Sequence, residues 1–427
     1  MSGLAERNGG RVGLAVLAAI LLLGLGLRLD YAWDGREPVF DAAAYAEIAR
    51  NLDEGRGFEL GAGATQPASN YSPGLPLLAG GFYEITGGVH ERSARVVLAL
   101  VGALAVLFAY LIGRRLSGPT AGLIGAGAVA IYPALLEYQG MLMGEPLAAT
   151  LLSGAVLAIL WAADEDRRRV AWLLPGLLLG ALALVRPEYL GVSVLLSFVV
   201  LGRSPRDWQR AVILLAGLAL VIAPWTIRNA IELDRFVPVS TGGGQVLFAG
   251  TYLPSDGDPE KVGAEVIARH PGLFDPQDVE RLRLEQILAR LASQRYPDLE
   301  ADKALARMGR EQLWDDLTQE PAEYGGFVAT KVWRIWSQGT REVMDRPGWK
   351  VFHWALVALG LLGLAVLARQ RRWEALLLAT AFVAITAISA LLVASPRRVL
   401  VMLPLVASLS GVGLTWLWAR LRGRLEH

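Results

Sequence analysis

Residues 96 to 112 read VVLALVGALAVLFAYLI, a run without a single charge, and Arg114 and Arg115 follow it directly. The hydrocarbon core of a bilayer is about 30 Å thick and is crossed by roughly 17 to 25 apolar residues in an α-helix. The run therefore predicts a membrane-spanning helix. Its basic end is expected in the cytoplasm, because short cytoplasmic loops retain arginine and lysine.

Nine further apolar runs have the same character. They cover approximately residues 12–29, 120–136, 146–163, 170–185, 189–201, 211–227, 351–367, 373–393 and 399–418. The runs at 170–185 and 189–201 are short and are separated only by Arg186, Pro187 and Glu188, so they form either two crossings or one re-entrant pair. The sequence thus predicts an all-α polytopic membrane protein with about ten transmembrane helices.

The composition excludes several other classes of protein. Of the 427 residues, 54% are hydrophobic and 19% are charged, and the mean hydropathy is +0.40, which excludes an ordinary soluble enzyme of this length. The formal net charge of +1 argues against a nucleic-acid-binding protein, which usually has a basic excess. Because the chain has no cysteine, disulfides, thiolate metal sites and cysteine nucleophiles are also excluded.

Arginines in alternate short loops predict the orientation of the helices. On the same side as Arg7 and Arg11 lie Arg114, Arg115, Arg167, Arg168, Arg169, Arg203, Arg206, Arg210, Arg369, Arg371, Arg372, Arg420, Arg422 and Arg424. Both termini are therefore expected in the cytoplasm. The first run is expected to remain as an anchor, because no small-residue cleavage site stands out after it.

Two long polar segments, residues 30–94 and 229–348, are then expected to face outward. The predicted organisation is a transmembrane module over 1–228, an extracytoplasmic helical subdomain over 229–348, and transmembrane helices over 349–427. In the subdomain an apolar residue recurs at the i, i+3, i+4, i+7 spacing of an amphipathic helix, at Leu284, Ile287, Leu288 and Leu291.

The first outward loop contains DAAAYAEIARNLDEGRGF, which starts at Asp41. One helical face carries Tyr45, Ile48, Ala49 and Leu52, which predicts a short helix lying in the membrane interface. Asp41 at its start can cap the helix, and it can also act as a general base on a hydroxyl brought to the membrane surface. A turn at Pro73 and Gly74 predicts a second interfacial helix.

Arginines at the outward ends of apolar runs contradict the trend of the short loops. These are Arg28, Arg95, Arg186, Arg228, Arg397 and Arg398. An ionisable residue at membrane depth is costly and usually functional, although any one of them is explained by snorkelling to headgroups or by pairing with Glu188 or Asp34. Because guanidinium groups bind phosphate oxygens bidentately, the set predicts a cradle for a phosphate on a membrane lipid.

Glu145 lies at the outward start of the fourth run, before Pro146. A helix N-terminus favours both residues, and Glu145 can also orient an acceptor or bind a cation. No metal ligand is assigned, because His90, His270, His353 and His427 have no metal-ligand spacing. No cofactor is assigned either, and the role of a divalent cation is left open.

Seven segments between residues 40 and 405 carry a resemblance to a known family. They are FDAAAYAEIARNLDEGRGF, YSPGLPLL, MLMGEPL, ALVRPEYL, APWTIRN, RFVPVSTGGGQVLFAG and SPRRVLVMLPL. Together they resemble the membrane-embedded GT-C glycosyltransferases related to protein O-mannosyltransferases and the lipid A aminoarabinose transferase. The resemblance extends over about residues 12–415, and residues 254–320 carry no motif of this family.

The resemblance implies an enzyme of the cell membrane that transfers a sugar from a polyprenyl monophosphate to an acceptor hydroxyl on the extracytoplasmic face, usually with inversion. The acceptor is a lipid, a glycan or a protein. Asp41 matches the catalytic base of the family, and Glu145 matches the acid in its second outward loop. Relatives often have two adjacent acids at the first site, whereas Ala42 follows Asp41 here, which weighs against a two-carboxylate or metal-bridged site.

The resemblance also implies roles for further residues. By analogy Arg186, Arg228 and Arg397 or Arg398 contact the donor phosphate, and Tyr45 and Tyr71 position the acceptor or the loop. This agrees with the chemistry, because a glycosyl phosphate already has a good leaving group and needs one base and several cations. The alternatives are a transporter or flippase of polyprenyl-linked sugars, which would place its polar site near the midplane, and a scaffold that binds a partner.

Overall fold

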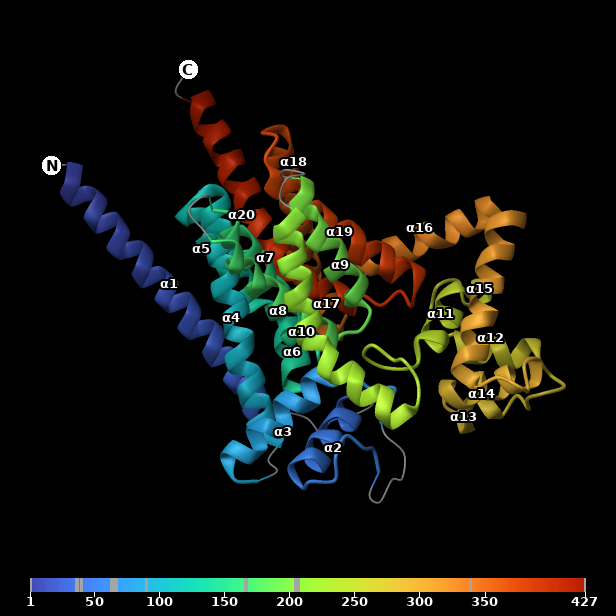
Figure 1. Ribbon diagram of the computed structural model, residues 1–427. Coiled ribbons are helices and arrows are strands. Elements are labelled where there is room, and N and C mark those ends of the chain that lie inside the picture. Colours follow the sequence, from blue (N-terminus) through green and yellow to red (C-terminus); the bar gives the residue numbers. More distant parts are fainter. Residues whose placement is uncertain are drawn as a thin grey trace. The chain divides into compact units, whose positions relative to one another are not determined.

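The computed structural model describes residues 2–34, 38, 41–61, 68–88, 91–164, 168–202, 208–337 and 340–425, and within these ranges the regular elements are helices (Figure 1). The chain divides into two compact units. Unit 1 comprises Met1–Val239, Arg341–Phe382 and Val399–His427, and unit 2 comprises Ser240–Thr340 and Val383–Arg398. The prediction of an all-α membrane protein is confirmed.

Unit 1 contains most of the long apolar helices. Its N-terminal part is formed by α1 (Ser2–Trp33), α2 (Asp41–Asp53), α3 (Gly74–Thr86), α4 (Glu91–Ser117), α5 (Pro119–Ile131), α6 (Pro133–Gly140), α7 (Glu145–Ala162), α8 (Leu173–Val185), α9 (Tyr189–Val199) and α10 (Trp208–Leu233), with 3-10 turns at Arg169–Trp172 and Val200–Gly202. Its C-terminal part is formed by α17 (Glu342–Asp345), α18 (Pro347–Arg369), the first half of α19 (Trp373–Leu391) and nearly all of α20 (Arg397–Leu425).

Of the described helices, seven are long and apolar enough to cross a membrane. They are Arg11–Trp33, Glu91–Ser117, Glu145–Ala162, Trp208–Leu233, Pro347–Arg369, Trp373–Leu391 and Arg397–Gly423. The pair α5 and α6, bent by 47°, would make an eighth, and Arg169–Val185 and Tyr189–Val199 are shorter apolar helices. Each predicted run therefore coincides with a helical segment, but the number of ten crossings is not confirmed.

Glycines allow helices α8 and α10 to pack closely. A Cβ atom added at Gly176 would lie 2.1 Å from the carbonyl oxygen of Leu214, and one added at Gly217 would lie 2.6 Å from that of Leu173. Neither position has room for a side chain. Close backbone approach through small residues is the usual way in which helices associate inside membranes.

The predicted run at 120–136 is interrupted between α5 and α6. Pro133 has no N–H, so the carbonyl of Val129 loses the donor that a continuous helix would supply. Arg28 of α1 provides replacement donors, with Nη2 donating to the carbonyl of Val129 at 3.2 Å and Nη1 donating to that of Ala130 at 3.3 Å. Because Arg28 is 2% exposed, it is a buried cap of this helix end.

The first outward loop contains the two predicted interfacial helices, α2 and α3. The predicted apolar face of α2 is confirmed, since Tyr45, Ile48 and Ala49 are buried and Leu52 is half-buried. Helix α3 follows the turn at Pro73 and Gly74 and packs against α2. Both helices are therefore packed within unit 1.

Unit 2 is a helical subdomain with a core of its own. Its elements are α11 (Gly243–Thr251), the 3-10 turn Leu253–Ser255, α12 (Val262–Arg269), α13 (Asp278–Arg281), α14 (Leu284–Arg295), α15 (Ala301–Gln319), α16 (Pro321–Ser337) and the end of α19. The predicted stripe on α14 is confirmed, because Ile287, Leu288 and Leu291 are buried in this core and Leu284 packs against it.

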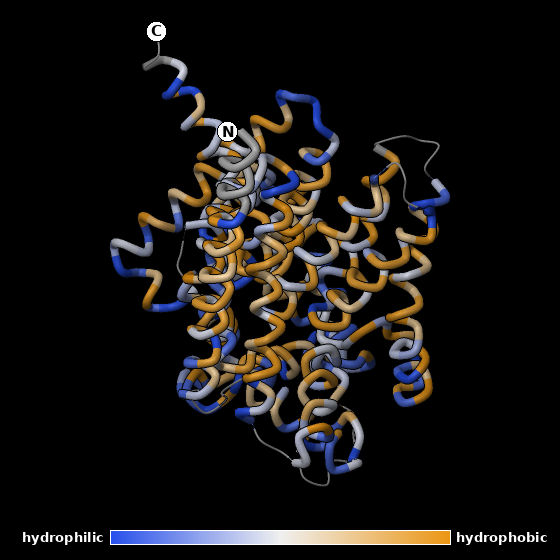
Figure 2. The backbone as a smooth tube through the Cα atoms, turned by 90° about the vertical axis from the view of Figure 1, so that its left-hand side faces the viewer, coloured by the Kyte–Doolittle hydropathy of each residue, from blue (hydrophilic) through white to orange (hydrophobic). Residues whose placement is uncertain are grey.

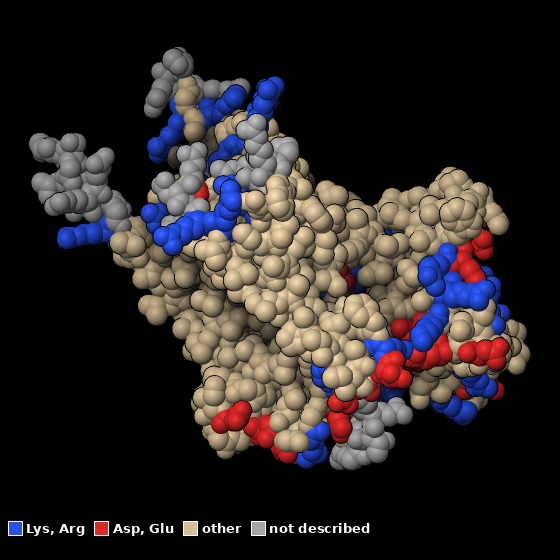
Figure 3. Space-filling model, viewed as in Figure 1, with Lys and Arg blue, Asp and Glu red and all other residues tan. Residues whose placement is uncertain are grey.

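Hydrophobic and charged residues occupy different positions along the length of the long helices. Figure 2 shows hydrophobic residues along their middle parts and hydrophilic residues in the connections at their ends. On the face seen in Figure 3, Lys and Arg gather at the end of unit 1 where α1 begins and α20 finishes, whereas Asp and Glu also occur at the end where α2 and α3 lie. This distribution is typical of a bilayer-spanning bundle with unlike ends.

Candidate functional site

Asp41 is the first residue of α2, and its side chain is half-buried. The next residue, Ala42, is fully buried and belongs to the same core cluster as Tyr138 and Met143, which flank the turn after α6. The start of α2 is therefore fixed, and the helix dipole favours a negative charge at this end. These contacts hold the backbone at Asp41 in a defined position beside the segment 138–143.

Glu145 and Arg186 form an ion pair in which the Glu145 side chain is 2% exposed and that of Arg186 is 19% exposed. Glu188 adds a second carboxylate, 3.8 Å from Arg186 Nη1. Glu145 starts α7, and Arg186 follows α8 in an extended conformation. The short Arg186-Pro187-Glu188 connection, expected from the sequence to separate two apolar helices, thus carries the charged centre of this site.

Val185 joins the first outward loop to this ion pair. The hydroxyl of Ser72 donates to the carbonyl of Val185 at 2.8 Å, and a Cβ added at Gly74 would lie 2.5 Å from Val185 Cγ2. A Cβ at Gly144 would lie 3.5 Å from Val185 Cγ1 and 3.6 Å from Arg186 Nε. Three segments far apart in the sequence therefore meet at one point.

Tyr45 connects Asp41 with the ion pair. Its hydroxyl shares a hydrogen bond with Ser72, and its ring packs edge-on against Tyr71 with ring centroids 5.9 Å apart. Burial raises the pKa of Tyr45, Arg186 opposes this shift, and Asp41 and Glu145 reinforce it. The phenol is therefore a hydrogen-bond donor at neutral pH and not a base.

Asp41, Tyr45, Tyr71, Glu145 and Arg186, which sequence reasoning selected, thus come together in unit 1. The structure adds Ser72 and Glu188 to this group. Their arrangement places a carboxylate and a guanidinium near the Tyr45 phenol, where α7 begins and α8 ends. A base and a cation side by side can act on a hydroxyl and on a phosphate respectively.

Arg228, on α10, has a different environment. Its guanidinium lies over the ring of Trp225, 5.0 Å from the centroid, and 5.7 Å from that of Phe58, while Nη1 donates to Asn229 Oδ1 at 3.1 Å. Stacking uses the face of a guanidinium and leaves its in-plane N–H groups available to an anion. Arg228 therefore borders the first outward loop through Phe58.

Arg397 and Arg398 belong to unit 2, at the start of α20. Arg397 Nε donates to Ser395 Oγ at 3.3 Å, and Arg398 contributes to the electrostatic environment of the buried Lys331. A shared cradle of these two arginines with Arg186 and Arg228 stays a prediction.

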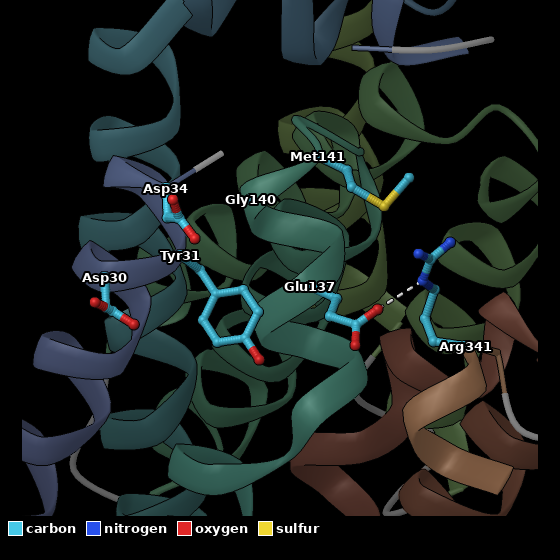
Figure 4. Close-up of a pocket in the computed structure, with 7 residues that line it drawn as sticks. All are labelled: Asp30, Tyr31, Asp34, Glu137, Gly140, Met141 and Arg341. Atoms are coloured by element: carbon cyan, nitrogen blue, oxygen red, sulfur yellow. Dashed lines mark hydrogen bonds and ion pairs between the residues drawn. The ribbon is translucent and has the colours of Figure 1, made fainter. Parts of the chain in front are cut away.

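A polar cavity of about 310 Å³ opens between α1 and α6 in unit 1 (Figure 4). Its lining residues are Asp30, Tyr31, Asp34, Glu137, Gly140, Met141 and Arg341. Arg341 Nε donates to Glu137 Oε2 at 2.7 Å, and the two aspartates lie on the opposite wall. The cavity is therefore lined by three carboxylates and one guanidinium, and the guanidinium is already paired with Glu137.

Sequence reasoning missed Glu137, Arg341 and Lys331. Glu137 interrupts an apolar stretch, and an acid at such a position is a signal of function that could have been used. Within the described ranges, no group of three or more His, Asp or Glu side chains is arranged to hold a metal ion. Two of the histidines considered as ligands, His90 and His427, lie outside these ranges.

The described part of the chain is thus a polytopic, all-α membrane protein with a charged cluster where α7 begins and α8 ends. Residues 69–227 match the family model of dolichyl-phosphate-mannose-protein mannosyltransferases. No curated protein sequence matches the chain.

Solved structures that are similar to this chain include an archaeal oligosaccharyltransferase and ArnT. The apo crystal structure of the Archaeoglobus fulgidus oligosaccharyltransferase has a TM-score of 0.57 and 17% identity, covering 97% of this chain and 52% of that one. The same protein, AglB, with an inhibitory peptide and a dolichol-phosphate has a TM-score of 0.57 and 17% identity, with coverage of 97% and 51%. ArnT from Cupriavidus metallidurans bound to undecaprenyl phosphate has a TM-score of 0.41 and 16% identity, with coverage of 95% and 78%.

The chain thus spans about half the length of the archaeal oligosaccharyltransferase whose fold it shares. The resemblance to GT-C glycosyltransferases inferred from the motifs is confirmed by the family model over residues 69–227 and by the fold.

Proposed function

We propose that this protein is a membrane glycosyltransferase that moves a sugar from a polyprenyl monophosphate to an acceptor hydroxyl on the extracytoplasmic face. The observation that carries the proposal is the meeting of Asp41, Tyr45 and the Arg186–Glu145 pair at one point. A carboxylate and a guanidinium are the two groups that this reaction requires, one for the nucleophile and one for the leaving group.

In the proposed step, the Asp41 carboxylate accepts the proton of the acceptor hydroxyl while the hydroxyl oxygen attacks the anomeric carbon. The bond between this carbon and the phosphate oxygen breaks, and polyprenyl phosphate leaves with the electron pair of that bond. Attack opposite to the leaving group inverts the anomeric configuration. Arg186 stabilises the charge that develops on the phosphate, and Arg228, Arg397 and Arg398 are proposed as further phosphate contacts.

Glu145 acts in this proposal through Arg186. The Glu145 carboxylate is enclosed by its ion pair, and it fixes the orientation of the guanidinium that faces the phosphate. Tyr45 and Tyr71 position the acceptor or the loop by their packing and by the phenol donor of Tyr45. Glu145 is therefore proposed to position Arg186, with Asp41 as the general base.

The orientation of the protein follows from its charges. Basic residues at the end where α1 begins and α20 finishes support cytoplasmic termini, by the rule that short cytoplasmic loops are positive. Asp41 and Arg186 then lie on the extracytoplasmic side. The polyprenyl tail of the donor remains in the bilayer while its phosphate reaches Arg186.

Donor consumption by the purified protein in lipid nanodiscs tests the proposed function. A panel of polyprenyl-phosphate sugars is offered together with membrane extract as the acceptor source, and products are identified by mass spectrometry. We expect one donor to be converted to polyprenyl phosphate and its sugar to appear on a lipid, glycan or protein. Tight binding without consumption, together with sugar-lipid flipping in vesicles, would support a transporter instead.

A further inference from the structure

Lys331 is a buried amine that the proposed reaction does not use. The chain has only four lysines, and Lys331, on α16, is 1% exposed. Its Nζ donates to the carbonyl of Gly250 at 2.6 Å and to that of Leu392 at 2.7 Å. One side chain therefore connects three segments of unit 2: α16, the end of α11, and the connection from α19 to α20.

The backbone around these carbonyls is closely packed. A Cβ added at Gly250 would lie 2.4 Å from the carbonyl carbon of Leu392, and one added at Gly257, whose φ is +68°, would lie 2.5 Å from Lys331 Cγ. The Phe327 ring, with its centroid 5.0 Å from Nζ, covers the amine. Leu392 therefore has little freedom to move while Lys331 is in place.

The segment held in this way leads directly to Arg397 and Arg398. Only a few residues separate Leu392 from these arginines, and the turn is closed by the bond from the Arg398 N–H to the Ser395 carbonyl at 3.1 Å. The nearby charge of Arg398 acts on the Lys331 amine. Anything that releases Leu392 would thus release the turn that presents both arginines.

The amine can make this contact in either protonation state. Burial lowers the pKa of Lys331 to about 7, and the positive charge of Arg398 shifts it in the same direction. An ammonium group has three N–H bonds and a neutral amine has two, so both forms can serve two carbonyls. The contact therefore persists on both sides of neutral pH.

We propose that Lys331 is a positioning residue, which holds the 392–398 segment so that Arg397 and Arg398 can bind the donor phosphate. The first part of this inference, that Lys331 holds the 392–398 segment, concerns unit 2 alone and does not require any substrate. The second part, that the held Arg397 and Arg398 bind the donor phosphate, rests on the proposed function.

Hydrogen exchange of the amides in residues 388–398, measured in nanodiscs without donor, tests the first part. Lys331→Met keeps the length of the side chain and removes its donors, so we expect exchange in this segment to rise about tenfold. In Lys331→Arg, which retains N–H donors, the exchange rate of this segment should be closer to that of the wild type. The matched control is Lys303→Met in the same unit, where the side chain is 63% exposed.

Gly250→Ala tests the same contact without changing the amine, and it replaces Lys331→Met should that variant not fold. Its added methyl group should push Leu392 away and raise exchange in the same segment. Wild-type exchange in both variants, or exchange in Lys331→Arg as fast as in Lys331→Met, would overturn the proposal.

Donor kinetics test the second part. We expect Lys331→Met to raise the KM for the active donor about tenfold with little change in kcat, because it affects phosphate binding and not the base. Faster exchange with an unchanged KM would overturn the link to the donor. If the wild type consumes no donor at all, the proposed function fails, while the exchange data still decide whether Lys331 holds the segment.

Discussion

Arg186 pairs with Glu145 across the start of α7 and the end of α8, and the Glu145 carboxylate is almost completely enclosed in this contact. In such a pair each charge compensates the other. Removal of one partner leaves the other as a buried, uncompensated charge, which destabilises the fold. It also places a positive charge close to Tyr45 and hence to the start of α2. The stability of the site and its chemistry therefore depend on the same two residues.

Replacement of one member of this pair should destabilise the protein. We expect Glu145→Gln and Arg186→Gln each to lower the free energy of unfolding by about 3–5 kcal/mol. The double variant Glu145→Gln/Arg186→Gln should lose less free energy of unfolding than the sum of the two single losses, because neither member of the pair then remains as a charge facing a neutral partner. Unfolding midpoints in nanodiscs measure this, and a wild-type midpoint for Glu145→Gln would contradict the role of the pair.

Arg28 should contribute to stability and not to donor binding. Arg28→Met leaves the carbonyls of Val129 and Ala130 without their donor, and each buried unpaired group costs about 1–3 kcal/mol. The donor KM of the folded fraction should equal that of the wild type. Arg11→Met, on the exposed part of the same helix, is the control. A selective rise in donor KM for Arg28→Met would show that Arg28 binds phosphate.

Two glycine substitutions should have opposite effects. Gly176→Ala forces a methyl group against the Leu214 carbonyl of α10 and should separate α8 from α10 at a cost of several kcal/mol. Gly127→Ala has nothing within 4 Å of the added Cβ, and it should be neutral or stabilising by about 0.5–1 kcal/mol, because alanine is the better helix former. Equal unfolding midpoints for the two variants would refute the close α8–α10 packing.

Burial of Lys331 makes stability depend on pH. Its pKa falls from the ordinary value of 10.5 to about 7, so between these values the unfolded chain holds a proton that the folded chain has released. The free energy of unfolding contributed by Lys331 therefore rises with pH over this range. The difference in unfolding midpoint between wild type and Lys331→Met should widen from pH 7 to pH 9. A constant difference would show that the amine is not desolvated.

The sequence predicted those parts of the fold that follow from hydrophobic periodicity. The apolar face of α2, the stripe on α14 and the positions of the long helices all have a local cause, and the structure confirms them. The bend between α5 and α6 also has a local signal in Pro133, but it lies within an apolar run that looks continuous. Length and apolar content alone therefore did not reveal it.

The site was predictable only in part, because its contacts are distant in the sequence. The motifs selected Asp41, Glu145 and Arg186, but not that Glu145 pairs with Arg186, since 41 positions separate them. Arg28 was grouped with the phosphate-binding arginines because its charge looked uncompensated at membrane depth. Its partners are backbone carbonyls of another helix, and a sequence pattern does not show where such carbonyls lie.

Asp41→Asn tests the central claim most directly. Asparagine has nearly the same shape and is also favoured at a helix start, so the fold should be preserved while the base is lost. The measurement is a single-turnover assay of the consumed donor, with donor binding determined in parallel. We predict wild-type binding and a rate lower by a factor of about 10² to 10⁴ for Asp41→Asn. A wild-type rate in this variant would contradict the assignment of Asp41 as the general base.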